Sequence, residues 1–241
     1  MQARDSIPES YLALLDALWV RDFSSRPYTQ RVAEYCLELA NLRTDFDRMD
    51  DLLFLFYEWL ECEGSDNATA FVRKKFLVVH SEDNIVIRVH AYRERVFQLV
   101  NLALELGSSE EKRNLIDDVA QKLQQHGHVL LLACLTTLTQ SKTPAIKDAL
   151  DRRTEFVHRL PKRDWVSLRS GGMLLEWLDL DWDQESFGSK KPHEIQLESD
   201  NLRRKFQDIR QFIGSICREL DDFEVGFCRT LYRSYADQKP Q

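Results

Sequence analysis

Apolar residues recur at helical spacing along most of this 241-residue chain. Two segments carry an unbroken heptad pattern, in which successive apolar positions alternate between steps of four and three residues. The first pattern occupies Ile85, Val89, Tyr92, Val96, Leu99, Ala103 and Leu106. The second occupies Leu202, Phe206, Ile209, Ile213, Ile216, Leu220, Phe223 and Phe227. Each pattern predicts a long helix, and the two apolar faces are expected to pack together in an up-down bundle.

Three shorter helices are predicted within residues 6–62. Ser6 with Glu9 resembles a capping box that opens the first of them. The second is expected over residues 28–41, and Thr44 is expected to cap the third. The apolar positions assigned to this third helix are Leu52, Leu53, Phe56 and Leu60.

A linker is predicted at residues 63–69, EGSDNAT, because Gly, Ser, Asp and Asn favour turns. Residues 71–80 fit either a short strand or a helical turn, since periodicity does not decide over so short a segment. Ser81 is expected to cap the first long helix, and Gly107 is expected to end it.

The middle of the chain predicts three more helices. Ser108 with Glu111 suggests a capping box for a helix that reaches about Gln125, and residues 129–138 are apolar enough for a buried helix. Thr143 and Pro144 then predict a cap and a first-turn proline. Pro161 is expected to end this last helix at or before Leu160. Residues 161–196 are less regular and are interpreted as an insertion or a long connection.

An all-α protein follows, since helix-favouring residues dominate and the chain has only 8 Gly and 6 Pro. The predicted organisation is an N-terminal helical region over residues 1–79 and an up-down helical bundle over 80–241, with the irregular insertion at about 161–196. Five cysteines form no CxxC pair, and no signal peptide or membrane-spanning run is visible. We therefore expect a cytoplasmic protein that does not contact membranes.

Charge points to one candidate site. The formal net charge of −7 argues against a general nucleic-acid coat, yet residues 151–163 hold five Lys or Arg against two acids. Within this stretch, ALDRRTEFVHRLP, Arg153 and His158 suggest phosphate chemistry. A histidine that titrates near neutrality accepts a proton from an RNA 2′-hydroxyl, and an arginine stabilises the negative charge on phosphorus. The charged end of a surface helix is the alternative interpretation.

Spacing limits this hypothesis. On a straight helix, five residues advance about 7.5 Å and turn about 140°, so Arg153 and His158 do not share a face. They converge only if the helix ends or tightens near His158, or if a second subunit completes the site. Arg152 is a rival for the arginine role. No metal or cofactor is required or expected, and His126 and His128, which flank Gly127, are interpreted as a solvated turn.

The sequence RRTEFVHRLP, with four residues between Arg153 and His158, resembles the Arg-x(4–6)-His motif of the HEPN superfamily (higher eukaryotes and prokaryotes nucleotide-binding domain). The helices HAYRERVFQLVNLALEL (90–106) and RNLIDDVAQKLQ (113–124) are also similar to those of HEPN domains, so that the resemblance covers roughly 84–236. It implies a HEPN-like bundle that acts as a homodimer.

Many HEPN members are metal-independent endoribonucleases of toxin–antitoxin, antiviral defence or stress systems. The resemblance therefore implies an RNA or nucleotide ligand, and an antitoxin protein as a further partner. It makes Arg153 and His158 the catalytic pair. The residues expected to help bind the substrate are Arg152, Thr154, Arg159 and Lys162.

Catalytic members commonly place Asn, Asp or His directly after the motif arginine, whereas Thr154 stands there in this chain. The alternative function is accordingly a non-catalytic HEPN-like scaffold that dimerises or binds a nucleotide or RNA.

Overall fold

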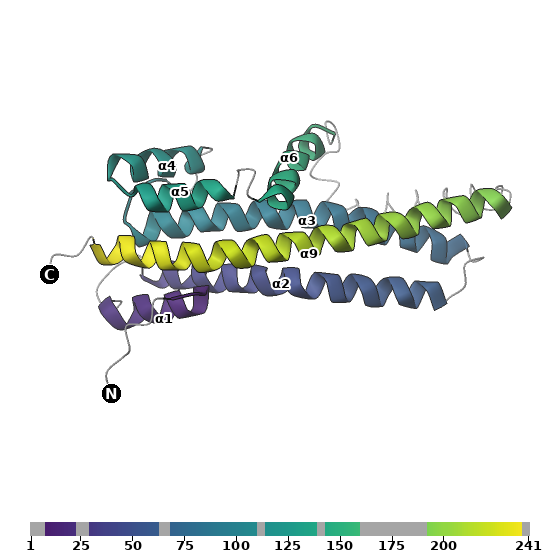
Figure 1. Cartoon of the computed structure of the whole chain (residues 1–241), viewed down its shortest axis with the longest axis horizontal. Coiled ribbons are helices and arrows are strands. Elements are labelled where there is room, and N and C mark those ends of the chain that lie inside the picture. Colours follow the sequence, from purple (N-terminus) through teal and green to yellow (C-terminus); the bar gives the residue numbers. More distant parts are fainter. Residues whose placement is uncertain are drawn as a thin grey trace. The chain divides into compact units, whose positions relative to one another are not determined.

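The computed structural model describes residues 8–22, 29–62, 68–109, 114–138, 143–159 and 192–237. These ranges contain α-helices and turns and no strand, which confirms the all-α class. No helix in them is long and apolar enough to cross a membrane. The helices are α1 (Tyr11–Asp22), α2 (Thr29–Cys62), α3 (Ala68–Ala103), α4 (Leu115–Gln125), α5 (Val129–Thr137), α6 (Pro144–Arg159) and α9 (Pro192–Asp237) (Figure 1).

Helices α2 and α3 are longer than predicted because two expected caps do not act as caps. The hydroxyl of Thr44 donates to the carbonyl of Ala40, and that of Ser81 donates to the carbonyl of Leu77, both four residues back. A hydroxyl bonded in this way sits inside a helix and does not open one. Residues 29–41 and 44–60 therefore belong to one helix, and residues 71–80 are helical.

Two helix starts are also fixed by other residues than those predicted. Ser6 lies outside the described residues, and the Ser10 hydroxyl accepts the first-turn N–H of Ala13 at 3.2 Å. At the start of α6, Pro144 is in the first turn as predicted, but Thr143 donates to the carbonyl of Thr137.

The carboxylate of Glu219 on α9 caps α6 in place of Thr143. Its two oxygens accept the backbone N–H groups of Ala145 and Ile146, each at 2.9 Å. A negative charge at a helix N-terminus satisfies orphan donors and complements the helix dipole. A contact between residues so far apart in the chain ties α6 to α9.

The Ser108–Glu111 capping box is not seen, since α4 begins later, at Leu115, and Glu111 lies outside the described residues. Ser108 instead exchanges two hydrogen bonds with the Asn101 side chain, at 2.8 and 2.9 Å. These bonds close the turn after α3, where Gly107 adopts a φ of +68°. The predicted irregular segment extends too far, because α9 is already helical from Pro192.

The described contacts divide the chain into two units. Unit 1 comprises Met1–Asp47, Arg88–Leu150 and Ser215–Gln241, and unit 2 comprises Arg48–Ile87 and Asp151–Gly214. Each unit therefore draws on segments far apart in the sequence. The heptad positions of both long helices are buried, as predicted from their spacing.

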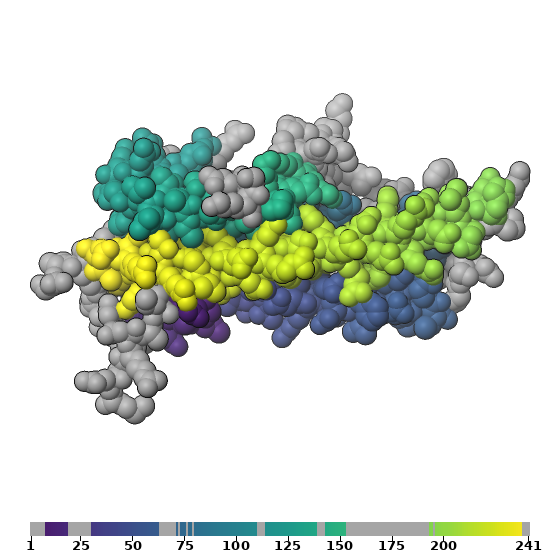
Figure 2. All heavy atoms as spheres, viewed as in Figure 1, coloured from purple at the N-terminus to yellow at the C-terminus, as the bar shows by residue number. Residues whose placement is uncertain are grey.

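Unit 1 holds α1, α4, α5 and parts of the longer helices. Asp45 pairs with Arg88, and Glu38 pairs with Arg95 at 2.6 Å, so these parts of α2 and α3 run antiparallel. Helices α4 and α5 pack against each other, and Figure 2 shows their side chains as one teal mass.

In unit 2, α2 and α9 run antiparallel. Tyr57 stacks on Phe206 with the ring centroids 3.8 Å apart, and Arg203 lies 3.5 Å from Glu61 one turn further along α2. Lys74 of α3 pairs with the same Glu61 at 3.0 Å, although the lysine is buried. A buried ammonium with a carboxylate partner avoids most of the desolvation cost of an isolated charge.

Replacement of Glu219 by alanine tests the cap of α6. The variant leaves the Ala145 and Ile146 N–H groups without their acceptor, and loss of a helix cap costs about 1 kcal/mol. For a chain of this size, we expect a fall in Tm of about 2–4 °C. Asp222→Ala, at an exposed position of the same helix, is the control and should leave Tm unchanged. Equal Tm values for Glu219→Ala and wild type would contradict the assignment.

Candidate functional site

The predicted ribonuclease residues lie at the C-terminal end of α6. Arg152, Arg153, Thr154, His158 and Arg159 all belong to this helix, whose end at Arg159 agrees with the predicted limit of Leu160. Of these five side chains only that of Arg152 is described, and Lys162 lies outside the described residues.

The backbone of α6 bears on the predicted catalytic pair. Because the helix continues through His158, positions 153 and 158 are separated by about 140° around its axis. The helix ends at Arg159, one residue after His158, so an end near His158, one route by which the pair was expected to converge, is present, while the side chains of Arg153 and His158 are not described. The other route, a second subunit, stays a prediction.

Arg152 is engaged within unit 2. Its Nη1 forms an ion pair with Oε1 of Glu82 on α3, and its guanidinium lies 5.0 Å from the ring centre of Phe212 on α9. The Arg152 side chain is 42% exposed. Arg152 therefore links α6 to α3 and α9 through this ion pair and this ring contact, and its role in substrate binding stays a prediction.

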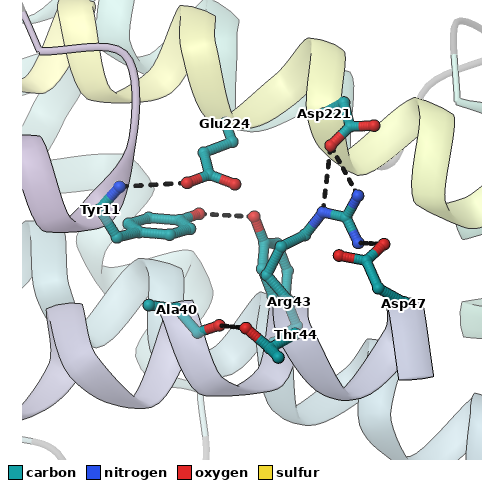
Figure 3. Close-up of polar contacts among 8 residues, drawn as sticks. Tyr11, Ala40, Arg43, Thr44, Asp47, Asp221 and Glu224 are labelled. Carbon is teal, nitrogen blue, oxygen red and sulfur yellow. Dashed lines mark hydrogen bonds and ion pairs between the residues drawn. The ribbon is translucent and has the colours of Figure 1, made fainter. Parts of the chain in front are cut away.

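A cluster of buried polar side chains lies in unit 1 (Figure 3). The hydroxyls of Tyr11 and Tyr92 share a hydrogen bond of 2.5 Å, and both side chains are buried. The backbone N–H of Tyr11 donates to Oε1 of Glu224 at 3.1 Å. These two contacts attach the first residue of α1 to α3 and to α9.

Arg43 lies in the same region of unit 1 (Figure 3). Its Nη2 donates to Asp221 of α9 at 2.6 Å, and its Nη1 donates to Asp47 of α2 at 2.7 Å. The guanidinium therefore joins α2 to α9 through two carboxylates. Arginine suits this role because its planar donors bind two acceptors in fixed directions.

The titration behaviour of this cluster follows from burial. Burial raises the pKa of Tyr11 and of Tyr92 well above the usual tyrosine value, and it raises the pKa of Glu224. Burial also raises the pKa of Cys36 to about 12, so this thiol stays protonated. A substrate has no access to tyrosines that are 0% and 1% exposed. We conclude that the contacts of this cluster hold α1, α2, α3 and α9 together within unit 1.

An exposed apolar surface lies on α2 within unit 2. Its members are more than half exposed: Leu52 53%, Leu55 62%, Phe56 52% and Trp59 53%. The opposite side of the same helix is buried through Leu53, Tyr57 and Leu60. We call the set Leu52, Leu55, Phe56 and Trp59 the outer face of α2.

The outer face has a regular pattern. Leu52, Leu55 and Trp59 follow steps of three and four residues, and the exposed Arg48 and Cys62 continue the same row at its two ends. A row with this spacing is the pattern with which one helix packs against another. Contiguous exposed apolar side chains of this size are typical of interaction sites.

Leu52, Leu53, Phe56 and Leu60 were predicted as apolar positions of the third helix, and their pattern did not distinguish the exposed Leu52 and Phe56 from the buried Leu53 and Leu60. The signal is the composition of residues 52–60, LLFLFYEWL, which is apolar at every position except Glu58. Such a segment has more apolar residues than one buried face accommodates. The sequence predicts an excess of apolar surface but does not say which side is covered.

No group of three or more His, Cys, Asp or Glu side chains in the described ranges is arranged to hold a metal ion. No protein-family model, curated protein or solved structure matches this chain. The HEPN resemblance therefore stays a prediction, and the outer face of α2 is the candidate functional site that the described side chains define best.

The pair of buried hydroxyls gives a testable result. Tyr11→Phe or Tyr92→Phe alone leaves the other hydroxyl buried without its partner, which costs about 1–3 kcal/mol. The double variant removes both groups, so its free energy of unfolding should lie closer to wild type than the sum of the two single losses. Urea unfolding of the four proteins measures this coupling. Strictly additive losses would show that the two hydroxyls do not depend on each other.

Proposed function

We propose that the protein is a non-catalytic helical scaffold that assembles with another protein through the outer face of α2. The observation that carries this proposal is the exposure of Leu52, Leu55, Phe56 and Trp59 on one side of α2. Each large apolar side chain that a partner covers contributes up to about 1.5–3 kcal/mol of favourable transfer free energy. Burial of all four side chains by a partner therefore contributes several kcal/mol of favourable binding free energy.

The polar groups support the same proposal. Arg152 is occupied by Glu82 and Phe212, and the tyrosine pair of unit 1 is closed to solvent. In both arrangements, polar side chains of types that also occur in active sites connect helices. A rigid helical frame with an exposed apolar row is what a scaffold requires.

A comparison of two leucines on α2 tests whether the outer face is kept for binding. Leu55→Gln alters a side chain that is 62% exposed, so the free energy of unfolding should change by less than about 0.5 kcal/mol. Leu53→Gln, at a position that is 3% exposed, should cost about 3 kcal/mol or more. Urea unfolding measures both. A comparable loss for Leu55→Gln would place the outer face in the core and refute the proposal.

The metal-independent endoribonuclease is the second candidate function. One observation favours it: residues 151–163 are basic within an acidic protein, and they carry the Arg153–His158 pair. In this alternative, His158 moves the proton of a 2′-hydroxyl and Arg153 stabilises the phosphate, in a homodimer that defence or stress systems would use. An antitoxin protein would be the expected partner.

Incubation with total RNA in EDTA separates the two functions. The scaffold proposal predicts no cleavage above the level of a His158→Ala preparation, even at high protein concentration. The matched control is His193→Ala, which changes an exposed histidine on α9. Cleavage by wild type and by His193→Ala that disappears only in His158→Ala would establish the ribonuclease and refute a purely non-catalytic scaffold.

A further inference from the structure

We infer that the outer face of α2 binds an amphipathic helix of a partner protein whose apolar row is bordered by Lys or Arg. This inference rests on the proposed scaffold function and names the chemistry of the partner. It follows from the spacing of the exposed apolar residues and from the charge beside them.

The spacing identifies the partner as a helix. Leu52 and Trp59 occupy equivalent heptad positions, and Leu55 lies between them in the row that Arg48 and Cys62 extend. Two heptads of α2 span about 21 Å, which corresponds to about four helical turns of a partner. A strand or an irregular segment does not match a period of three and four residues.

Two acidic residues border the row on one side. Asp51 and Glu58 each precede a residue of the outer face by one position, so both lie about 100° from it in the same direction. Both are exposed and they are one heptad apart. In paired helices, the residues at such flanking positions select the partner and its orientation through interhelical ion pairs.

Arg210 of α9 lies beside this border and neutralises only part of the border's negative charge. Nε and Nη2 of Arg210 donate to the two oxygens of Asp50 at 2.7 and 2.8 Å, and the guanidinium lies 4.7 Å from the ring centre of Phe54. Arg210 also lies within electrostatic range of Asp51 and Glu58. Asp50, Asp51 and Glu58 together carry three negative charges against this one positive charge, so the border stays acidic. A complementary partner carries Lys or Arg one heptad apart along its own border.

The same charges disfavour two other occupants. In an antiparallel pair of α2 helices from two copies, the acidic borders meet, so that Asp51 of one copy comes near Glu58 of the other. Helices that lie on membranes carry Lys or Arg beside their apolar face, because the lipid surface is anionic. An acidic border repels both a second copy in this arrangement and an anionic membrane.

Binding of two designed peptides tests the inference. Both peptides have three heptads with the same leucine row, one with Lys and the other with Glu at the flanking positions, and each is used below its own self-association concentration. Fluorescence anisotropy of the labelled peptides against the full chain should show at least tenfold tighter binding of the Lys peptide. The difference should shrink as salt rises, because exposed charges are screened.

Charge reversal supplies the matched variants. Asp51→Lys with Glu58→Lys should reverse the peptide preference, while Asp222→Lys, at an exposed acid of α9, should leave it unchanged. Leu55→Gln should weaken the binding of both peptides. A preference for the Lys peptide that survives the double reversal would overturn the role assigned to this border.

The remaining outcomes separate failure of this inference from failure of the scaffold proposal. If both peptides bind equally and Leu55→Gln abolishes this binding, the partner is not selected by Lys or Arg, so the inference is wrong. The outer face of α2 is then still a binding site, as the scaffold proposal requires. Self-association in sedimentation velocity that Leu55→Gln abolishes makes a second copy the occupant and overturns the inference. Binding to vesicles with about one-third anionic lipid that is lost in Leu55→Gln makes a membrane the occupant of the outer face, and this result also overturns the inference. Absence of peptide binding, self-association and vesicle binding overturns both the inference and the scaffold proposal.

Discussion

Burial of the heptad rows along α3 and α9 is the constraint on which the other features depend. The rows belong to the longest described helices, and every heptad position in them is buried. Within unit 1, Tyr92 of α3 meets Phe223 of α9 edge to face, with ring centroids 6.4 Å apart. Shorter elements attach to this frame through pairs of polar contacts, such as the Glu219 cap of α6 and the Tyr11 contacts of α1.

A helix that packs against such a frame buries one side only. In unit 2, α2 presents Leu53, Tyr57 and Leu60 to the core, and Tyr57 stacks on Phe206. The segment carries more apolar residues than this side holds, so the rest form the outer face. More than half of each of these side chains is exposed in the described part of the chain, and we propose that a partner covers them. The acidic border beside them then restricts which helix fits.

Sequence patterns predicted the features that repeat and missed those that depend on one distant contact. The two heptad rows were predictable because seven and eight consecutive positions agree with one period. The roles of Thr44 and Ser81 were not, since the same hydroxyl either caps a helix or bonds the carbonyl four residues back. The cap of α6 was hidden because Glu219 is remote in sequence. At the candidate site, periodicity predicted an apolar helix but did not show which of its sides is exposed. For Arg153 and His158, the sequence predicted only the angle that separates the two positions around a helix.

The central claim is that a basic-bordered helix covers the outer face of α2, and fluorine NMR tests it most directly. The chain has five tryptophans, and Trp59 is the one that belongs to the outer face of α2. In protein labelled with 5-fluorotryptophan, Trp59→Phe identifies the resonance of this residue. We expect the Lys-bordered peptide to shift the Trp59 resonance, and the Glu-bordered peptide to shift it less at the same concentration. Shifts of other tryptophans with an unmoved Trp59 resonance would contradict the central claim.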